Sequence, residues 1–195
     1  MSLNYNVNYY HLTKVQIFMD DKEYYSIENQ IKRNEESRER EADKKRFKKL
    51  LNDPNFLIVP QWHLLKPDID FLKLEDDQHI ELADVDSYEL YIITKEELFR
   101  ILDESFSSVY IKTKIWKNHD NDKIIKVLQN WEKNIKLIPP VVTFNFCSKK
   151  FNIQDGKHRF AVANYFEAET IPIIILKNEE VNFLANVNNE KINKK

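Results

Sequence analysis

The run Asp155-Gly-Lys-His-Arg159 is the part of this 195-residue chain whose residue types best suit chemistry. Gly156 is the only glycine in the sequence, and glycine is needed where φ is positive or where another group approaches the backbone closely. Lys157, His158 and Arg159 stand where a helix would begin. Cations at that end oppose the helix dipole unless an anion binds there. The segment therefore predicts an anion site, with phosphate as the preferred anion.

Each residue of this segment has an expected role. Gly156 would let a phosphate approach the backbone, Lys157 would supply a mobile charge, and Arg159 would supply a planar fork for oxygens. Asp155 is a candidate for capping the helix or holding a metal that bridges phosphates, and capping is preferred. His158 is a candidate for proton transfer or for a structural contact with the sheet, and the structural role is slightly preferred. Asp155 and His158 are thus the candidate catalytic residues.

The pattern around this motif predicts the elements that position it. Apolar residues alternate over 142–146 and return over 151–153, which indicates two strands before the motif. A helix that continues to residue 166 and an apolar strand over 171–176 follow it. The motif is therefore expected at a strand-to-helix turn.

The motif and its flanking strands, residues 139–176, resemble the ParB/sulfiredoxin superfamily. Many members carry Asp-Gly-x-His-Arg, an alanine shortly after the arginine, and an Ile-Pro-Val strand beyond the helix; here the matching segments are 155–163 and 171–176. The weaker part of the resemblance extends back to about residue 107. The resemblance as a whole implies a small mixed sheet with flanking helices. Relatives include nucleotide hydrolases, an ADP-dependent serine kinase and nucleases.

Two departures from the family pattern narrow the expected activity. In sulfiredoxins the residue after this glycine is the catalytic cysteine, but here it is Lys157, and the single cysteine, Cys147, lies ten residues earlier. In the centromere-binding partition proteins the motif is Gly-Glu-Arg-Arg and a helix-turn-helix domain follows, whereas about twenty residues follow the last strand here. Sulfiredoxin and partition activities are therefore not expected.

The rest of the chain suggests an appendage and one α+β domain. Residues 1–55 are expected to hold a short strand over 14–18 and a long charged helix over 24–50, whose middle has almost no apolar residue and could face solvent or a protein partner. Residues 56–195 are expected to form the ParB/sulfiredoxin-like domain. Its further elements are strands over 56–59 and 88–93, helices over 95–105 and 122–136, an extended segment over 109–116 and an acidic connector over 68–89.

Composition limits the classes of function. The net charge of −2 gives no general attraction to nucleic acid, so such binding would need a local patch. The single cysteine allows no internal disulfide and fits a cytoplasmic protein. No apolar run suits a membrane span, and the five histidines lack zinc-ligand spacing, so neither a membrane partner nor a structural metal is expected.

The leading hypothesis is a cytoplasmic α+β protein that binds a nucleotide, with Mg²⁺, at residues 156–159. Hydrolysis or phosphoryl transfer at that site is left open, and nuclease activity is less favoured. The alternative is a non-enzymatic DNA-binding or regulatory module that uses the same basic turn for backbone phosphates. A third hypothesis is a protein-interaction module that presents the helix over 24–50.

Overall fold

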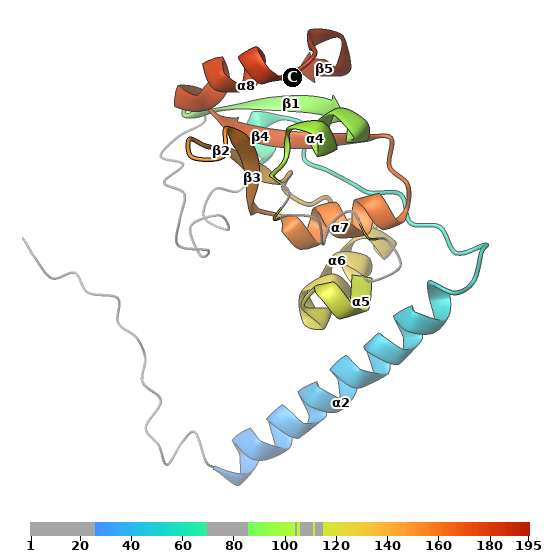
Figure 1. The fold of residues 1–195 in the computed structure, drawn as a ribbon. Helices are drawn as coiled ribbons and strands as arrows, with labels where there is room; N and C mark the ends of the chain where they lie inside the picture. Colours follow the sequence, from blue (N-terminus) through green and yellow to red (C-terminus); the bar gives the residue numbers. More distant parts are fainter. Residues whose placement is uncertain (1–25, 70–85, 104, 106–110, 112–114) are drawn as a thin grey trace, which may run out of the picture. The chain divides into compact units, whose positions relative to one another are not determined.

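The computed structural model describes residues 26–69, 86–103, 105, 111 and 115–195 (Figure 1). The chain divides into two compact units, residues 1–41 and 42–195, and each is considered by itself. The second unit combines helices with one mixed five-stranded sheet, which confirms the expected α+β class. Within the described residues, no helix has both the length and the apolar character that crossing a membrane requires.

The sheet has the strand order β3-β2-β4-β1-β5. Its strands are β1 (Tyr88–Thr94), β2 (Val141–Asn145), β3 (Lys150–Asp155), β4 (Thr170–Leu176) and β5 (Ile192–Lys194). Only the β2–β4 pair is parallel; the other neighbours are antiparallel. The central strand β4 is an almost continuous apolar run, because it has a strand on either side and buries side chains on both faces. Strands β1 to β4 match the strands that the sequence predicted, and β5 was not anticipated.

Among the described residues three helices carry the side-chain caps that favour a helix start; Ser26, just before residue 27, accepts a hydrogen bond of 3.2 Å from the backbone N–H of Asn29. The helices are α2 (Ile27–Leu50), α4 (Lys95–Ile101), α5 (Ile115–Asn118), α6 (Asn121–Glu132), α7 (Lys157–Tyr165) and α8 (Glu180–Asn186), with 3₁₀ turns η1 (Lys66–Asp68), η4 (Lys177–Glu179) and η5 (Asn189–Lys191). The Thr94 side chain accepts a hydrogen bond from the backbone N–H of Glu97 at the start of α4. Asp120 caps α6 in the same way, so both starts follow from the sequence.

Several predicted boundaries are wrong, for local reasons. The helix predicted over 95–105 ends at Ile101, because Leu102 is extended and bridges to Phe151 of β3. The helix predicted over 122–136 ends at Glu132, because Asn134 takes a positive φ of 57°. Of the extended segment predicted over 109–116, residues 115 and 116 are helical and belong to α5, while residues 109, 110 and 112–114 lie outside the described residues.

The predicted strand over 56–59 is absent, since these residues pair with no other strand among the described residues. Of the acidic connector predicted over 68–89, residues 70–85 lie outside the described residues, and its end belongs to β1. The strand predicted over 14–18 also lies outside them.

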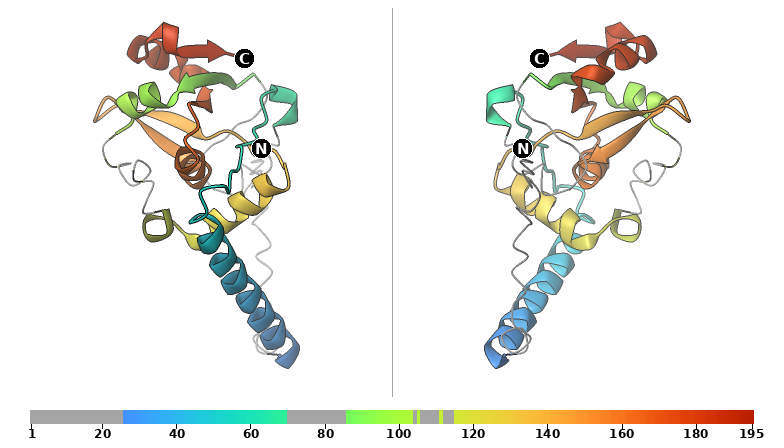
Figure 2. Two further views of the ribbon diagram at one scale, coloured as in Figure 1. Left: turned by 90° about the vertical axis from the view of Figure 1, so that its right-hand side faces the viewer. Right: turned by 90° about the vertical axis from the view of Figure 1, so that its left-hand side faces the viewer.

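The main core lies between the sheet and helices α4, α6, α7 and α8. Figures 1 and 2 show α7 between the sheet and α6. Trp131 of α6, Phe160 of α7, Phe151 of β3 and Phe183 of α8 are buried together in this cluster. A smaller cluster covers the other face of β1 and β4; it consists of Ile69, Tyr88, Leu90, Ile138, Val141 and Ile174. Strands β1 and β4 are therefore covered on both faces.

The last turns of α2 belong to the second unit, although the sequence placed the whole helix in an appendage ending at residue 55. Phe47 has no exposed surface and joins the main core. Asp43 accepts a hydrogen bond of 2.8 Å from Gln129, and Arg46 pairs with Glu132, both on α6. The boundary between the two units lies between residues 41 and 42, and the buried side chain of Phe47 places the last turns of α2 in the second unit.

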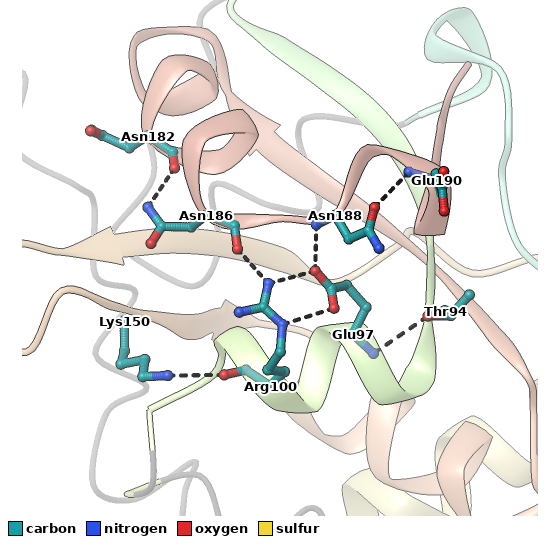
Figure 3. Close-up of polar contacts among 8 residues, drawn as sticks. All are labelled: Thr94, Glu97, Arg100, Lys150, Asn182, Asn186, Asn188 and Glu190. Atoms are coloured by element: carbon teal, nitrogen blue, oxygen red, sulfur yellow. Dashed lines mark hydrogen bonds and ion pairs between the residues drawn. The ribbon is translucent and has the colours of Figure 1, made fainter.

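The end of the chain is tied to α4 by a buried carboxylate (Figure 3). Glu97 accepts hydrogen bonds from Arg100 Nε at 2.9 Å and from the backbone N–H of Asn188 at 2.6 Å. Arg100 also donates to the carbonyl of Asn186. The hydrogen bonds from Arg100 hold the pKa of Glu97 below its ordinary value despite burial. This network fixes the segment between α8 and β5 to α4.

The burial of Phe47 predicts different outcomes for two truncations. Deletion of residues 1–41 should leave cooperative urea unfolding intact, because the second unit keeps its core. Deletion of residues 1–50 should lower the free energy of unfolding by about 3–5 kcal/mol, the scale of a Phe→Ala change in a core. Phe47→Ala in the full chain is the matched control and should lose a similar amount. Equal stability of all three proteins would show that Phe47 contributes nothing to the core.

Candidate functional site

The motif lies at the strand-to-helix turn that the sequence predicted. Asp155 is the last residue of β3, Gly156 occupies the N-cap position with φ 82° and ψ 13°, and Lys157 is the first residue of α7. A left-handed backbone at this point is unfavourable for residues with a Cβ, which explains a glycine here. The turn places Lys157, His158 and Arg159 together in the first turn of a helix that has no acidic residue there.

The glycine is also required by a neighbouring part of the chain. A Cβ built on Gly156 would lie 2.7 Å from Cα of Pro140 and 2.9 Å from Nη2 of Arg159. Pro140 immediately precedes β2, and its carbonyl accepts a hydrogen bond of 2.8 Å from the backbone N–H of Ile174 in β4. The close approach that a lone glycine predicted is therefore made by Pro140, and Gly156 itself is buried.

Asp155 does not cap the helix, contrary to the role preferred from the sequence. Among the described residues no side chain caps the N-terminus of α7, and the Asp155 carboxylate instead pairs with Nη2 of Arg159. The two side chains are largely buried, with exposed fractions of 15% and 21% respectively. Arg159 Nε is buried and has no hydrogen-bond partner among the described residues. The pair neutralises part of the positive charge in this first turn and fixes the direction of the guanidinium.

A second helix start contributes residues that sequence reasoning missed. His119 lies just before α6, and its ring meets the ring of His158 edge to face, with centroids 5.6 Å apart. Asp120 and Lys123, in the first turn of α6, act electrostatically on His158. The sequence marked Asp120 as a helix cap, but nothing in it showed that this helix start meets α7. His119 was considered only for zinc spacing.

The surroundings of His158 favour its neutral form. Burial lowers the pKa of His158 to about 4, and the neighbouring His119, Lys123 and Lys157 act in the same direction, while Asp120 opposes them. His158 is thus uncharged at pH 7 and adds no cation to the first turn of α7. The negative charge of a bound anion would oppose the effect of these neighbouring cations and favour protonation of His158.

The basic side chains of this turn suit an anion. Among the described residues no three His, Cys, Asp or Glu side chains gather as a metal site. A groove of about 350 Å³ lies at the other end of α7, beside Phe166 and Ala168, and none of the motif residues lines it. The motif therefore presents a turn in which Gly156 is buried and the three basic residues after it are partly exposed.

Comparison with protein-family models, with curated proteins and with solved structures gives no match.

The packing of Pro140 predicts how position 156 tolerates change. Gly156→Ala should lower the free energy of unfolding by roughly 2–4 kcal/mol, because a positive φ and an overpacked contact both disfavour a Cβ. Gly156→Asn separates the two causes, since asparagine tolerates the left-handed region but still carries a Cβ. In urea unfolding it should lose less stability than alanine but remain clearly less stable than the unmodified protein, because the contact with Pro140 persists. Near-native stability of the asparagine variant would mean that Pro140 moves away easily.

The lowered pKa of His158 predicts a pH dependence of stability. Between its ordinary pKa of 6.5 and about 4, the unfolded chain binds a proton that the folded chain rejects, so stability falls as the pH drops through this window. His158→Gln should remove about 1–2 kcal/mol of that loss, after allowance for solvent screening of a partly exposed ring. Unfolding free energies of both proteins measured from pH 4 to 7 check this. Parallel curves would contradict the buried, neutral histidine.

Proposed function

We propose that this chain binds a phosphate-bearing ligand, with a nucleotide as the preferred class, at the start of α7. The observation that carries the proposal is the first turn of α7, which has three basic side chains, no acidic residue and no side-chain cap. Backbone N–H groups and the helix dipole attract an anion to such an end. The helix dipole disfavours each permanent cation in this turn, and a bound anion reverses that effect.

The structure refines the role of each residue in this proposal. Lys157, half-buried at the first helical position, supplies a point charge to a phosphate oxygen. Arg159 is held by Asp155, so Asp155 acts as a positioning residue for the guanidinium. Gly156 serves the turn itself, because its missing side chain makes room for Pro140. The ligand is therefore bound by the first-turn backbone, Lys157 and the outer part of Arg159.

His158 gives the proposed site a dependence on pH. The ring is neutral in the free protein and lies next to His119 and Lys123. A phosphate dianion nearby would raise the pKa of His158, so His158 would take up a proton when phosphate binds. Affinity for inorganic phosphate should therefore increase as the pH falls from 7 toward 5.5, apart from the protonation of phosphate itself.

The same proposal includes the ParB/sulfiredoxin type of fold. The order of β3, motif, α7 and β4 supports it, as does the mixed sheet. Mg²⁺ would arrive as a complex with the nucleotide, with the phosphates as its principal ligands. Any turnover would depend on positioning and charge neutralisation, and release of inorganic phosphate would reveal it.

Thermal-shift measurements test the proposal directly. We expect stabilisation by at least one of ATP, ADP, CTP, GTP and inorganic phosphate, with and without Mg²⁺; a ligand at 100 times its Kd stabilises by about 2.7 kcal/mol. Lys157→Ala should weaken binding by roughly 1.5–3 kcal/mol, the scale of a hydrogen bond to a charged group. Lys133→Ala, at the opposite end of α6, removes the same charge away from the site and should bind normally.

The outcomes separate the alternatives. No shift with any of these ligands, or equal losses in both lysine variants, would contradict a specific phosphate site. Binding of DNA that falls steeply with salt and depends on Lys157 would favour the nucleic-acid module instead. Saturable nucleotide binding with weak salt dependence would support the nucleotide hypothesis.

A further inference from the structure

The segment after α2 has the side-chain pattern of a strand without a partner strand. Leu57 is 71% exposed, Ile58 is 4% exposed and Val59 is 61% exposed, which is the alternation of an extended chain lying on a core. The backbone N–H groups of these three residues form no hydrogen bond among the described residues. A few residues later the chain is paired: His63 N–H donates to the Leu137 carbonyl at 3.0 Å. The unpaired stretch is therefore a short open edge.

This edge forms one wall of the groove at the C-terminal end of α7. The groove has a volume of about 350 Å³. Its lining is apolar apart from a few groups: Leu57, Ile58, Val59, Pro60, Trp62, Leu64, Ile92, Phe166, Ala168, Glu169, Thr170 and Pro172. A groove of this size beside exposed Leu57 and Val59 can take one or two apolar side chains.

The groove has one charged lining residue, Glu169. Its side chain is exposed and forms no ion pair among the described residues. A carboxylate at the rim of an apolar groove favours a ligand that carries a basic group next to its apolar side chains.

We propose that residues 57–59 and this groove bind an extended peptide segment of a partner protein, which adds to the open edge as a strand. Successive N–H groups of an extended stretch point to opposite sides, and another backbone supplies carbonyl acceptors at the spacing of those on one side. A compact apolar surface would cover Leu57 and Val59 but leave those groups without partners. The segment would place alternate apolar side chains in the groove and a Lys or Arg near Glu169. Pro60, which has no N–H group, limits the added pairing to a short stretch.

A display experiment tests this proposal with random peptides in place of the partner. Random nonapeptides on phage are selected on the full chain and counter-selected on a Val59→Glu/Glu169→Lys variant, which changes only exposed side chains. The retained peptides should alternate apolar residues and include Lys or Arg. A retained peptide, made synthetically, should bind at least tenfold more weakly to the double variant. Val181→Glu, an equally drastic change at a residue 78% exposed on α8, should bind it normally.

Backbone pairing is tested separately from apolar contact. The same peptide with alternate amides N-methylated keeps its side chains but loses donors, and it should bind at least tenfold more weakly. Hydrogen exchange of residues 57–59 should slow when the unmodified peptide binds. The proposal is overturned if no peptide survives counter-selection, if N-methylation leaves the affinity unchanged, or if exchange at this edge does not slow. Concentration-dependent dimerisation abolished by Val59→Glu would instead assign the edge to a second copy of this chain.

Discussion

The contact between Gly156 and Pro140 is the constraint on which the rest of the domain depends. The turn at Gly156 reverses the chain from β3 into α7, and it fits only because no side chain stands between it and Pro140. Pro140 in turn leads into β2, and its carbonyl is bonded to Ile174 of β4. One backbone contact thus sets the position of β2, β3, β4 and the start of α7 relative to one another. A sequence almost free of glycine keeps its one glycine at this point.

The same turn gathers positive charge at the start of α7. Two permanent cations and a histidine follow the glycine at the positive end of a helix dipole. Asp155 compensates Arg159, and His158 avoids charge through a pKa lowered to about 4. The backbone N–H groups of the first turn of α7 add to this positive end. We infer an anion site because, among the described residues, this basic turn has neither an acidic residue nor a side-chain cap.

Helix α7 links the two proposed sites through its ends. Its middle is buried on several sides, from Phe160 to Asn164, between the sheet and α6. Such a helix is rigid, so the basic turn at its start and the apolar groove at its end keep fixed positions. The C-terminal segment is held separately, because Glu97 and Arg100 fasten it to α4 (Figure 3). The two proposals nevertheless rest on different residues and fail in different experiments.

Local patterns in the sequence determined most of the elements. Strands β1 to β4 were readable because their apolar residues alternate or run continuously, and the helix starts at Thr94 and Asp120 were readable because capping depends on adjacent residues. The motif residues and their strand-to-helix turn were also recognised from sequence, since a glycine between a strand and basic residues has few other uses.

Tertiary structure decided the remaining points, because each depends on residues far apart in the chain. Packing between separate elements decided three contacts at the site. Gly156 makes room for Pro140, Asp155 pairs with Arg159 and does not cap the helix, and His119 meets His158. Phe47 has the sequence context of a solvated helix end, yet the core of the second unit buries it completely. Residues 56–59 carry a strand pattern, but a strand needs a neighbour, and no local pattern reveals whether one is present.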